Sequence, residues 1–477
     1  MSNRRFGDGY PPARKLIRDA KLVSLPVAYA GRQAAGVGKR ALGRPGAGVN
    51  LDIQVRTAQH IFQVLGELKG CATKLGQLLS IYELVLPPKF AEPYRMALTQ
   101  LQDSTPIMLP QTVETAMAAH MGSNWRWYFR EFDTRRAAGA SIGQVHRGVW
   151  HDGTEVAIKV MYPGARAAVH ADLDQLRRMS VLGTVFVPGA DVKAVTEAIC
   201  DCISEELDYE AEAENQRVFA DAYADDADFV VPRVLARHGD VIISEWLTGT
   251  PLSRIIASGA PEERNRLGLL LLRFVLSSWN RAGLLYCDVH PGNFRVLPDG
   301  RLGVVDFGAC APWPAPEFPG VVSGYFEALF NGGRTELEAA IRDHGFAEPG
   351  RTIDVDAVAE AFVPLCDPFL HNTFRLSTDW FRQQIRRAMD PRLSNANRDL
   401  TMPPYFTPFA RAFLTVIGVV CQLDTEGPIR AEFVRWVPEI AAALESFDRR
   451  GGKPADLGIA RTLRGTGPRP LSAVHTG

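Results

Sequence analysis

The stretch Tyr286-Cys-Asp-Val-His-Pro-Gly-Asn-Phe294 decides the fold of this 477-residue chain, and the apolar run Leu302-Gly-Val-Val-Asp-Phe-Gly308 follows it closely. The spacing predicts a phosphoryl-transfer site, because Asp288 can orient an attacking hydroxyl or water while Asn293 reaches a metal from the same loop. Asp306, at the end of a predicted buried strand, would hold Mg²⁺ against the phosphates of ATP. Each short motif is common by chance, so the prediction rests on their joint spacing and their strand-like neighbours.

The region before this stretch has the pattern of a β-rich lobe that covers a nucleotide. The small-residue loop Ala138-Gly-Ala-Ser-Ile-Gly-Gln-Val-His146 leads into a predicted strand at 147–150, and His151-Asp-Gly-Thr154 predicts a hairpin turn. The next predicted strand, Glu155-Val-Ala-Ile-Lys-Val160, carries one lysine. Kinases cover the phosphates with such a loop and pair them with such a lysine. The residues expected near the phosphates are Ala138, Gly139, Ala140, Ser141 and Lys159.

Further along, helical and strand patterns alternate. Residues 171–224 predict long helices, and their carboxylate-rich run Glu205-Glu-Leu-Asp-Tyr-Glu-Ala-Glu-Ala-Glu214 is either a solvated face or the source of a glutamate that orients the lysine. Strands are predicted at 125–132, 229–232 and 241–247, and backbone groups near Glu245 and Leu247 would meet the adenine edge. An apolar helix is predicted at 261–283, and helices with Pro/Gly breaks follow from 318 to 447. This order predicts an α+β fold with a β-rich lobe, a helical lobe and the chemistry between them.

A strongly amphipathic helix is predicted from residue 56 to Pro87-Pro88. Its apolar residues recur alternately at four and three positions, which gives one continuous stripe. Lys74 and Gln77 are neighbours one turn apart on its polar surface. The stripe consists of Ile61, Leu65, Leu68, Ala72, Leu75, Leu79 and Tyr82.

The overall composition is that of a soluble protein, with 46% hydrophobic residues, 22% charged residues and a formal net charge of −1. This balance gives no attraction for nucleic acid. The first fifty residues are different, because they hold ten Lys or Arg against two Asp. Such a segment is either a solvated tail or a binding element for anionic membrane lipids.

The cysteines and the apolar runs indicate the compartment. Cys200-x-Cys202 has no second pair, which argues against zinc, and seven scattered cysteines suggest free thiols in a reducing cytoplasm. No apolar run reaches about 18 residues, so no membrane span is expected. The longest run, at 412–423, has the length of a buried helix.

The motifs together resemble those of the UbiB/ADCK family of atypical kinases, also called AarF-like. The match covers roughly residues 55 to 310 closely. The matching elements are Lys74-Leu-Gly-Gln77, Leu101-Gln-Asp103, the Ala-rich loop at 138–146, Glu206-Leu-Asp208, Asp288-Val-His-Pro-Gly-Asn293 and Asp306-Phe-Gly308. The chain departs from the family pattern where Tyr286, Cys287 and Val289 replace His, Ala and Pro, and where Gly139 replaces an alanine.

The resemblance implies a bilobal protein-kinase-like fold, with an amino-terminal helical extension that lies over the active site and blocks protein substrates. It implies that Glu212 pairs with Lys159 and that Lys74 meets Glu206 and Asp208, with Gln77 nearby. The implied cofactors are ATP and Mg²⁺. The implied activity is slow ATP hydrolysis that supports isoprenoid quinone or lipid metabolism, in the cytoplasm or peripherally at the inner face of the membrane.

The predicted organisation has five parts: a basic tail at 1–50, the helical extension at 51–124, the kinase-like N-lobe at 125–248, the helical C-lobe at 249–448 and a basic tail at 449–477. Two other functions fit parts of the pattern. A small-molecule kinase of the aminoglycoside or choline kinase type also carries Asp-x-His-x-x-Asn, but it lacks a Lys-x-Gly-Gln helix. A nucleotide-binding pseudokinase scaffold would keep the fold without turnover. The physiological substrate and the oligomeric state stay open.

Overall fold

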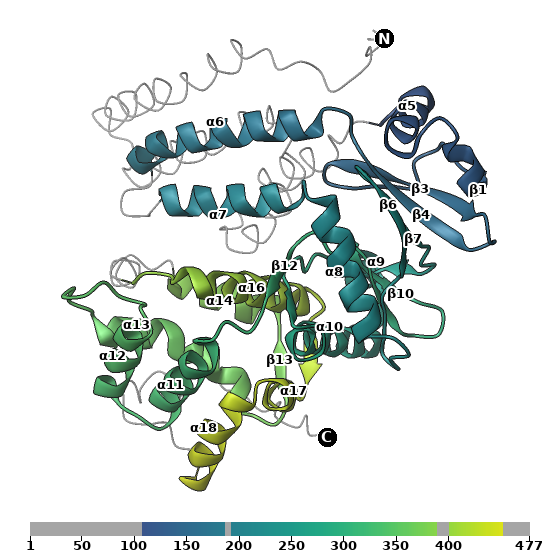
Figure 1. Ribbon diagram of the computed structural model, residues 1–477. Coiled ribbons are helices and arrows are strands. Elements are labelled where there is room, and N and C mark those ends of the chain that lie inside the picture. Colours follow the sequence, from purple (N-terminus) through teal and green to yellow (C-terminus); the bar gives the residue numbers. More distant parts are fainter. Residues whose placement is uncertain (1–106, 187–191, 389–399, 452–477) are drawn as a thin grey trace, which may run out of the picture. The chain divides into compact units, whose positions relative to one another are not determined.

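The computed structural model describes residues 107–186, 192–388 and 400–451 (Figure 1). The chain divides into two compact units. Unit 1 contains the described residues up to Arg254 together with Asp288–Cys310, and unit 2 contains Ile255–Cys287 and the described residues from Ala311 onward. The predicted helix with Lys74 and Gln77 lies outside the described residues.

The larger sheet of unit 1 is antiparallel. Its strand order is β1 (Phe129–Phe132), β3 (Gly143–Trp150), β4 (Glu155–Met161), β7 (Val241–Glu245) and β6 (Val234–His238), and β2 (Ala138–Gly139) also pairs with β3. Strand β4 shows why the lysine reaches a site. Side chains alternate between the two faces of a strand, so Val156, Ile158 and Val160 are fully buried while Lys159 points to the opposite face.

Three strand predictions need correction. Trp125–Tyr128 forms a 3₁₀ helix, η1, in which Trp125 is buried edge-on against the rings of Phe129 and Phe132. Strand β3 begins at Gly143, four residues earlier than predicted, since its pairing with β4 starts at Gly143 opposite Met161. Strand β6 was missed, because three apolar residues followed by Arg237 and His238, all partly buried, give no apolar alternation.

Four described helices belong to unit 1: α5 (Pro110–Met121), α6 (Ala165–Phe186), α7 (Val192–Glu205) and α8 (Tyr209–Ala222). Helices α6 and α7 lie side by side (Figure 1). Residues 206–208 separate α7 from α8, because the Asp208 side chain accepts hydrogen bonds from the amides of Glu210 and Ala211 and so caps α8. The long helices predicted in this region are therefore present, divided at the acidic motif.

A second sheet in unit 1 holds the motif that decided the fold. Its order is β5 (Phe229–Val230), β11 (Leu302–Val304), β10 (Phe294–Val296) and β8 (Thr250–Pro251). Strands β10 and β11 are antiparallel, with Phe294 opposite Val304. Because Asn293 precedes one strand and Asp306 follows the other, the pairing brings the loop and the strand end together.

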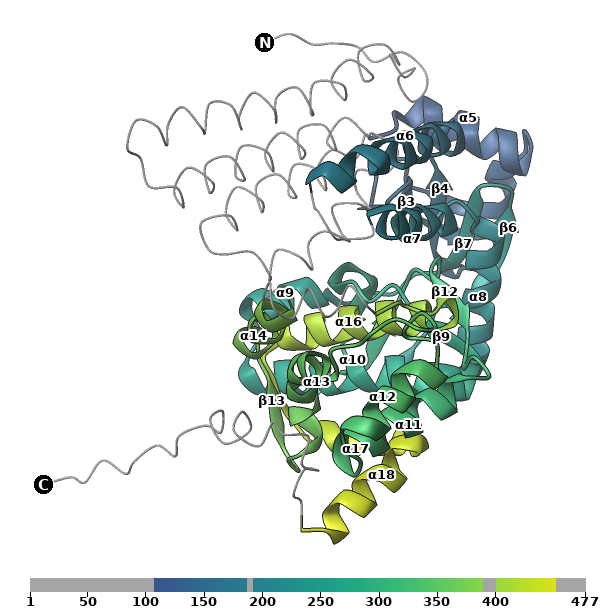
Figure 2. The same cartoon turned by 90° about the vertical axis from the view of Figure 1, so that its left-hand side faces the viewer.

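Unit 2 is mostly helical, as predicted. The apolar helix α10 (Pro261–Ala282) ends at Gly283, whose φ of 66° requires the left-handed conformation that glycine adopts without strain. It packs against α16 (Thr407–Gln422) and α17 (Ile429–Trp436) (Figure 2). The remaining elements around and after it are α9 (Leu252–Ser258), β9 (Leu284–Tyr286), β12 (Cys310–Pro312), α11 (Phe318–Phe330), α12 (Arg334–Asp343), α13 (Val355–Phe362), η3 (Val363–Phe369), β13 (Phe374–Leu376), α14 (Thr378–Ala388), η4 (Pro404–Phe406), β14 (Thr425–Gly427) and α18 (Pro438–Arg449).

One helical stretch, Pro404–Gln422, is long and apolar enough to cross a membrane, judged by length and composition alone. In the structure 39% of its most apolar window is buried. A core helix passes the same test, and the buried side chains of α16 lie toward its carboxy-terminal end, from Val416 to Cys421. The predicted buried helix therefore agrees with this packing.

Candidate active site

Lys159 is the centre of the candidate active site. Its Nζ lies 2.6 Å from Glu212 Oε1 and 3.2 Å from Asp306 Oδ2. The side chains are 13%, 5% and 21% exposed respectively, so the ammonium is held between two carboxylates largely away from water. The predicted pair of Lys159 with Glu212 is present. Glu210 and Glu214, two positions to either side on the same helix, are 77% and 67% exposed.

Burial and charge act on these groups in opposite directions. Burial lowers the pKa of Lys159, but the carboxylates of Asp306 and Glu212 raise it by more, so its pKa is well above the ordinary value. Burial raises the pKa of Glu212 to about 7, although Lys159 opposes the rise. The lysine therefore stays charged at every pH of interest, whereas its partner titrates near neutrality.

Asp306 is aimed at the lysine by an unusual backbone conformation. Its φ of 73° lies in the left-handed region, which short polar side chains tolerate better than most. The amide of Gly308 donates to Asp306 Oδ1 at 3.2 Å. The next residue, Phe307, is fully buried against Phe219 of α8, and its carbonyl accepts a hydrogen bond from Asn215 Nδ2. The turn is thus anchored to the helix that carries Glu212.

The loop from Asp288 to Asn293 is closed by its own hydrogen bonds. The amide of His290 donates to the Asp288 carbonyl, and the amide of Asn293 donates to the His290 carbonyl. Asn293 Nδ2 donates to Asp288 Oδ2 at 2.9 Å and to the Asp288 carbonyl at 3.1 Å. The amide of Val305 donates to the Asn293 carbonyl at 2.9 Å, which joins the loop to the strand that leads to Asp306.

The donor set fits Mg²⁺ that arrives with a nucleotide. Because Asn293 directs its amide nitrogen to Asp288, its side-chain oxygen is the atom left for a cation, and Asp306 adds carboxylate oxygens. Hard oxygen ligands suit Mg²⁺, which usually takes one or two protein groups together with phosphates and water. No cluster of three or more His, Cys, Asp or Glu that could bind a metal alone occurs in the described part of the chain.

The small-residue loop is a tight hairpin tied to the acidic motif. Ala138 and Gly139 pair with Val145 and Gln144, and the amide of Ala140 donates to the Gly143 carbonyl. The Ser141 hydroxyl donates to Glu206 Oε2, and Glu206 is only 4% exposed. The loop expected to cover the phosphates is therefore hydrogen-bonded to the buried carboxylate of Glu206.

The structure contains a buried series of hydrogen-bonded polar groups that the sequence analysis did not predict. Gln144 and His146 are both fully buried, and their Nε2 atoms lie 2.9 Å apart. His146 Nδ1 lies 2.9 Å from the Asp133 carbonyl, and the amide of Met108 donates to Gln144 Oε1. Burial lowers the pKa of His146, which favours the neutral ring. The sequence did hold a signal for this feature, because Gln144 and His146 are alternate residues and so lie on the same, buried face of β3.

The other predicted site residues have different surroundings. Glu245 lies at the end of β7, where its amide donates to the Arg233 carbonyl and its carboxylate binds the Arg233 guanidinium. Of its backbone groups only the carbonyl can meet adenine, so contacts of Glu245 and Leu247 with the base stay a prediction. Asp208 caps α8 and also lines a pocket in unit 1.

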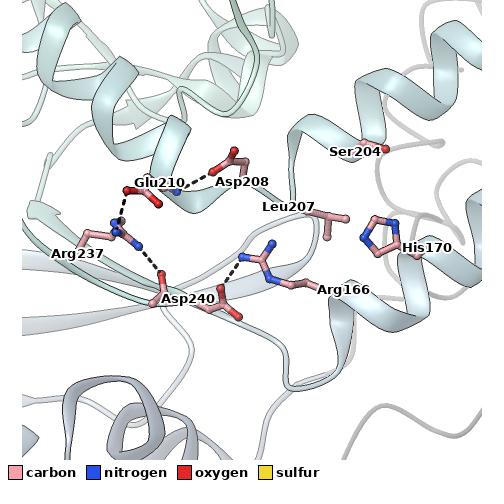
Figure 3. Close-up of a pocket in the computed structure, with 9 residues that line it drawn as sticks. Arg166, His170, Ser204, Leu207, Asp208, Glu210, Arg237 and Asp240 are labelled. Atoms are coloured by element: carbon pink, nitrogen blue, oxygen red, sulfur yellow. Dashed lines mark hydrogen bonds and ion pairs between the residues drawn. The ribbon is translucent and has the colours of Figure 1, made fainter.

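This pocket has a volume of about 480 Å³ and lies where α6, α7, α8 and the β6–β7 turn meet (Figure 3). Two ion pairs cross it: Arg166 Nη2 lies 2.6 Å from Asp240 Oδ1, and Arg237 Nη2 lies 3.3 Å from Glu210 Oε1. Asp208 is the one predicted site residue in its lining. The first pair joins α6 to the β6–β7 turn, and the second joins β6 to the start of α8. The lining residues are Arg166, His170, Ser204, Leu207, Asp208, Glu210, Arg237, Gly239 and Asp240.

Comparison with known proteins places this arrangement in context. Residues 100–332 match the model of the ABC1 atypical kinase-like domain. Atypical kinase COQ8B, mitochondrial, of Danio rerio is 29% identical over 65% of this chain and 51% of the relative. Atypical kinase coq-8, mitochondrial, of Caenorhabditis elegans is 28% identical over 66% of this chain and 42% of the relative. The chain thus spans about half the length of these curated relatives.

Among solved structures, the complex of Rv3197 with erythromycin from Mycobacterium tuberculosis is similar. It is 37% identical and superposes with a TM-score of 0.61, over 83% of this chain and all of that one.

Proposed function

Because this chain belongs to the UbiB family of ABC1-type atypical kinases, we propose that it binds Mg-ATP at Lys159 and transfers or hydrolyses the terminal phosphoryl group. One observation carries the proposal. The ammonium of the buried Lys159 contacts the carboxylates of Glu212 and Asp306 at 2.6 and 3.2 Å in unit 1, and the Asp288–Asn293 loop is hydrogen-bonded to the segment that leads to Asp306.

In this proposal the side chains divide the work of phosphoryl transfer. Lys159 pairs with the α- and β-phosphates, and Glu212 orients it. Asp306 and Asn293 would hold Mg²⁺, which when bound neutralises charge on the β- and γ-phosphates. Asp288 orients the attacking hydroxyl or water and accepts its proton.

The amino-terminal extension belongs to the same proposal. Lys74 would meet Glu206 and Asp208 and hold the extension over the site, with Gln77 beside it, so that proteins are poor substrates or none. Glu206 is buried and Asp208 is exposed, so removing the ammonium would leave the buried carboxylate of Glu206 without its cation. The variant Lys74→Ala should therefore change nucleotide affinity or preference, and nucleotide titration of this variant tests the assignment.

We infer further that the activity serves isoprenoid quinone or lipid metabolism at an anionic membrane surface. The basic first fifty residues support a membrane contact, since anionic lipids attract clustered lysines and arginines. The deciding experiment measures ATP hydrolysis by the full chain with and without anionic liposomes, with Asp288→Asn as the inactive control. Hydrolysis that the control retains would remove the proposed site, and hydrolysis indifferent to liposomes would remove the membrane role.

A second candidate function comes from one observation, the likeness to a structure described as a complex with erythromycin. We propose macrolide binding as this alternative. Calorimetric titration of the full chain with erythromycin, with and without MgADP, tests it. Absence of binding heat in both titrations would eliminate the alternative and leave the nucleotide proposal intact.

A further inference from the structure

The ammonium of Lys159 has a third neighbour besides its two carboxylates. Tyr209, the first residue of α8, lies beneath it, with Lys159 Nζ 5.2 Å from the centroid of the ring. The tyrosine is 1% exposed. An ammonium over the face of an aromatic ring is attracted by the quadrupole of the ring, and the attraction increases when both groups are away from water.

The hydroxyl of Tyr209 does not explain why a tyrosine is buried there. The oxygen is buried and finds no hydrogen-bond partner among the described residues. Burial raises the pKa of Tyr209, so the phenol stays protonated and neutral. A buried hydroxyl without a partner is unfavourable, and an aliphatic side chain would avoid that cost. The face of the ring is therefore the part of this residue that the site uses.

Two segments constrain the position of Tyr209. Asp208 caps α8 and so determines where Tyr209 begins the helix (Figure 3 shows this cap). On the other side, a Cβ atom added to Gly143 would lie 2.8 Å from the Tyr209 hydroxyl and would also meet the Val160 carbonyl. Only a glycine allows the hairpin of the small-residue loop to approach the tyrosine so closely. Tyr209 on α8 therefore has its hydroxyl next to Gly143 of the loop and its ring face next to the lysine of β4.

We propose that Tyr209 is a positioning residue for Lys159, acting through its ring face. The inference rests on the proposed nucleotide function. If Asp306 turns to Mg²⁺, Lys159 loses one of its two carboxylate partners. A third carboxylate at this place would hold the ammonium but repel the phosphates, whereas a neutral aromatic face attracts the ammonium without opposing the nucleotide.

The test compares Tyr209→Phe, which keeps the ring, with Tyr209→Leu, which removes it, in the full chain. Tyr223→Leu is the matched control, since Tyr223 is the C-cap of the same helix, is 2% exposed and packs on Phe219 and Phe229. The first readout is the rate at which an amine-reactive reagent modifies Lys159, relative to the other lysine peptides, by mass spectrometry without nucleotide. The second is the Kd for MgADP by calorimetry.

Loss of the ring should leave the Lys159 ammonium less firmly held and easier for the reagent to reach. Tyr209→Leu is expected to speed its modification by roughly 3- to 30-fold and to weaken MgADP binding by a similar factor. Tyr209→Phe and Tyr223→Leu should modify Lys159 at the parent rate, and Tyr209→Phe should bind MgADP as the parent does. Rescue by phenylalanine assigns the effect to the ring.

Three outcomes would overturn the proposal. Unchanged modification in Tyr209→Leu would show that the ring does not act on the ammonium. Equal effects of the phenylalanine and leucine variants would assign the effect to the hydroxyl, and a faster rate in Tyr223→Leu would show general loosening of the helix. If modification behaves as expected while the parent protein binds no MgADP, the nucleotide proposal fails and the positioning of Lys159 stands.

Discussion

Replacing Glu212 with glutamine is expected to stabilise unit 1 above neutral pH while it weakens the site. Burial raises the pKa of Glu212 from its ordinary 4.5 to about 7, which corresponds to about 3 kcal/mol. Because the pKa of Glu212 is higher in the folded state than in the unfolded state, the contribution of this residue to the free energy of unfolding is fully present below about pH 4.5. The contribution is lost as the pH rises through about 7. Glutamine is neutral at every pH and avoids this loss.

A competing effect has the opposite sign. Removing one partner of a buried ion pair commonly destabilises a protein by about 3–5 kcal/mol, because the other charge is left unpaired. Lys159 would not be left unpaired, since Asp306 remains 3.2 Å away and the Tyr209 ring lies beneath the ammonium. We therefore expect the relief of carboxylate burial to exceed the loss of the pair.

Thermal unfolding of the parent and Glu212→Gln between pH 5 and pH 9 measures the balance. The two midpoints should nearly coincide at pH 5, and the variant should unfold roughly 5–10 °C higher at pH 8. The same variant should bind MgADP at least about tenfold more weakly, because a neutral amide holds the ammonium less well. Glu214→Gln is the control, since Glu214 is exposed on the same helix and pairs with Arg217 on its surface.

Two results would refute this reasoning. A variant several degrees less stable than the parent at pH 8 would mean that the attraction between Lys159 and Glu212 exceeds the penalty of burial. A difference that stays constant from pH 5 to pH 9 would assign the effect to packing rather than to charge.

Four further variants test the surroundings of this pair. Asp306→Asn should lose the Mg²⁺-dependent part of ADP affinity, by about tenfold or more in calorimetry with and without Mg²⁺, and unchanged affinity would contradict its role as a ligand. Asp288→Asn should keep thermal stabilisation by nucleotide and lose ATP hydrolysis by about 10²-fold, so equal loss of both would count against a role in turnover. Ser141→Ala removes the hydrogen bond to Glu206, so amide exchange across 138–143 should be several-fold faster, and unchanged exchange would show that the bond does not hold the loop. Asp208→Ala removes the cap of α8 and should cost about 1 kcal/mol in the free energy of unfolding, and an unchanged midpoint would show that the cap contributes nothing.

Local patterns in the sequence were sufficient for several elements. The alternation of Glu155-Val-Ala-Ile-Lys-Val160 predicted a strand with its lysine on the face opposite the apolar residues, and β4 has that form. The apolar helix at 261–283 ends at the glycine where a left-handed residue was needed. Asp288 and Asn293 could be paired from spacing alone, since one tight loop brings residues five apart into contact.

Only the tertiary structure decided how the charges around Lys159 are arranged. Its partners Glu212 and Asp306 are 53 and 147 positions away in the sequence, and the family resemblance, not the residue pattern, selected Glu212 from a run of similar carboxylates. No sequence pattern predicted that the Tyr209 ring would contact the ammonium, because an aromatic residue at the start of a helix resembles an ordinary core residue. Strand and helix periods are properties of neighbouring residues, whereas the burial of a charge depends on which distant segments pack around it.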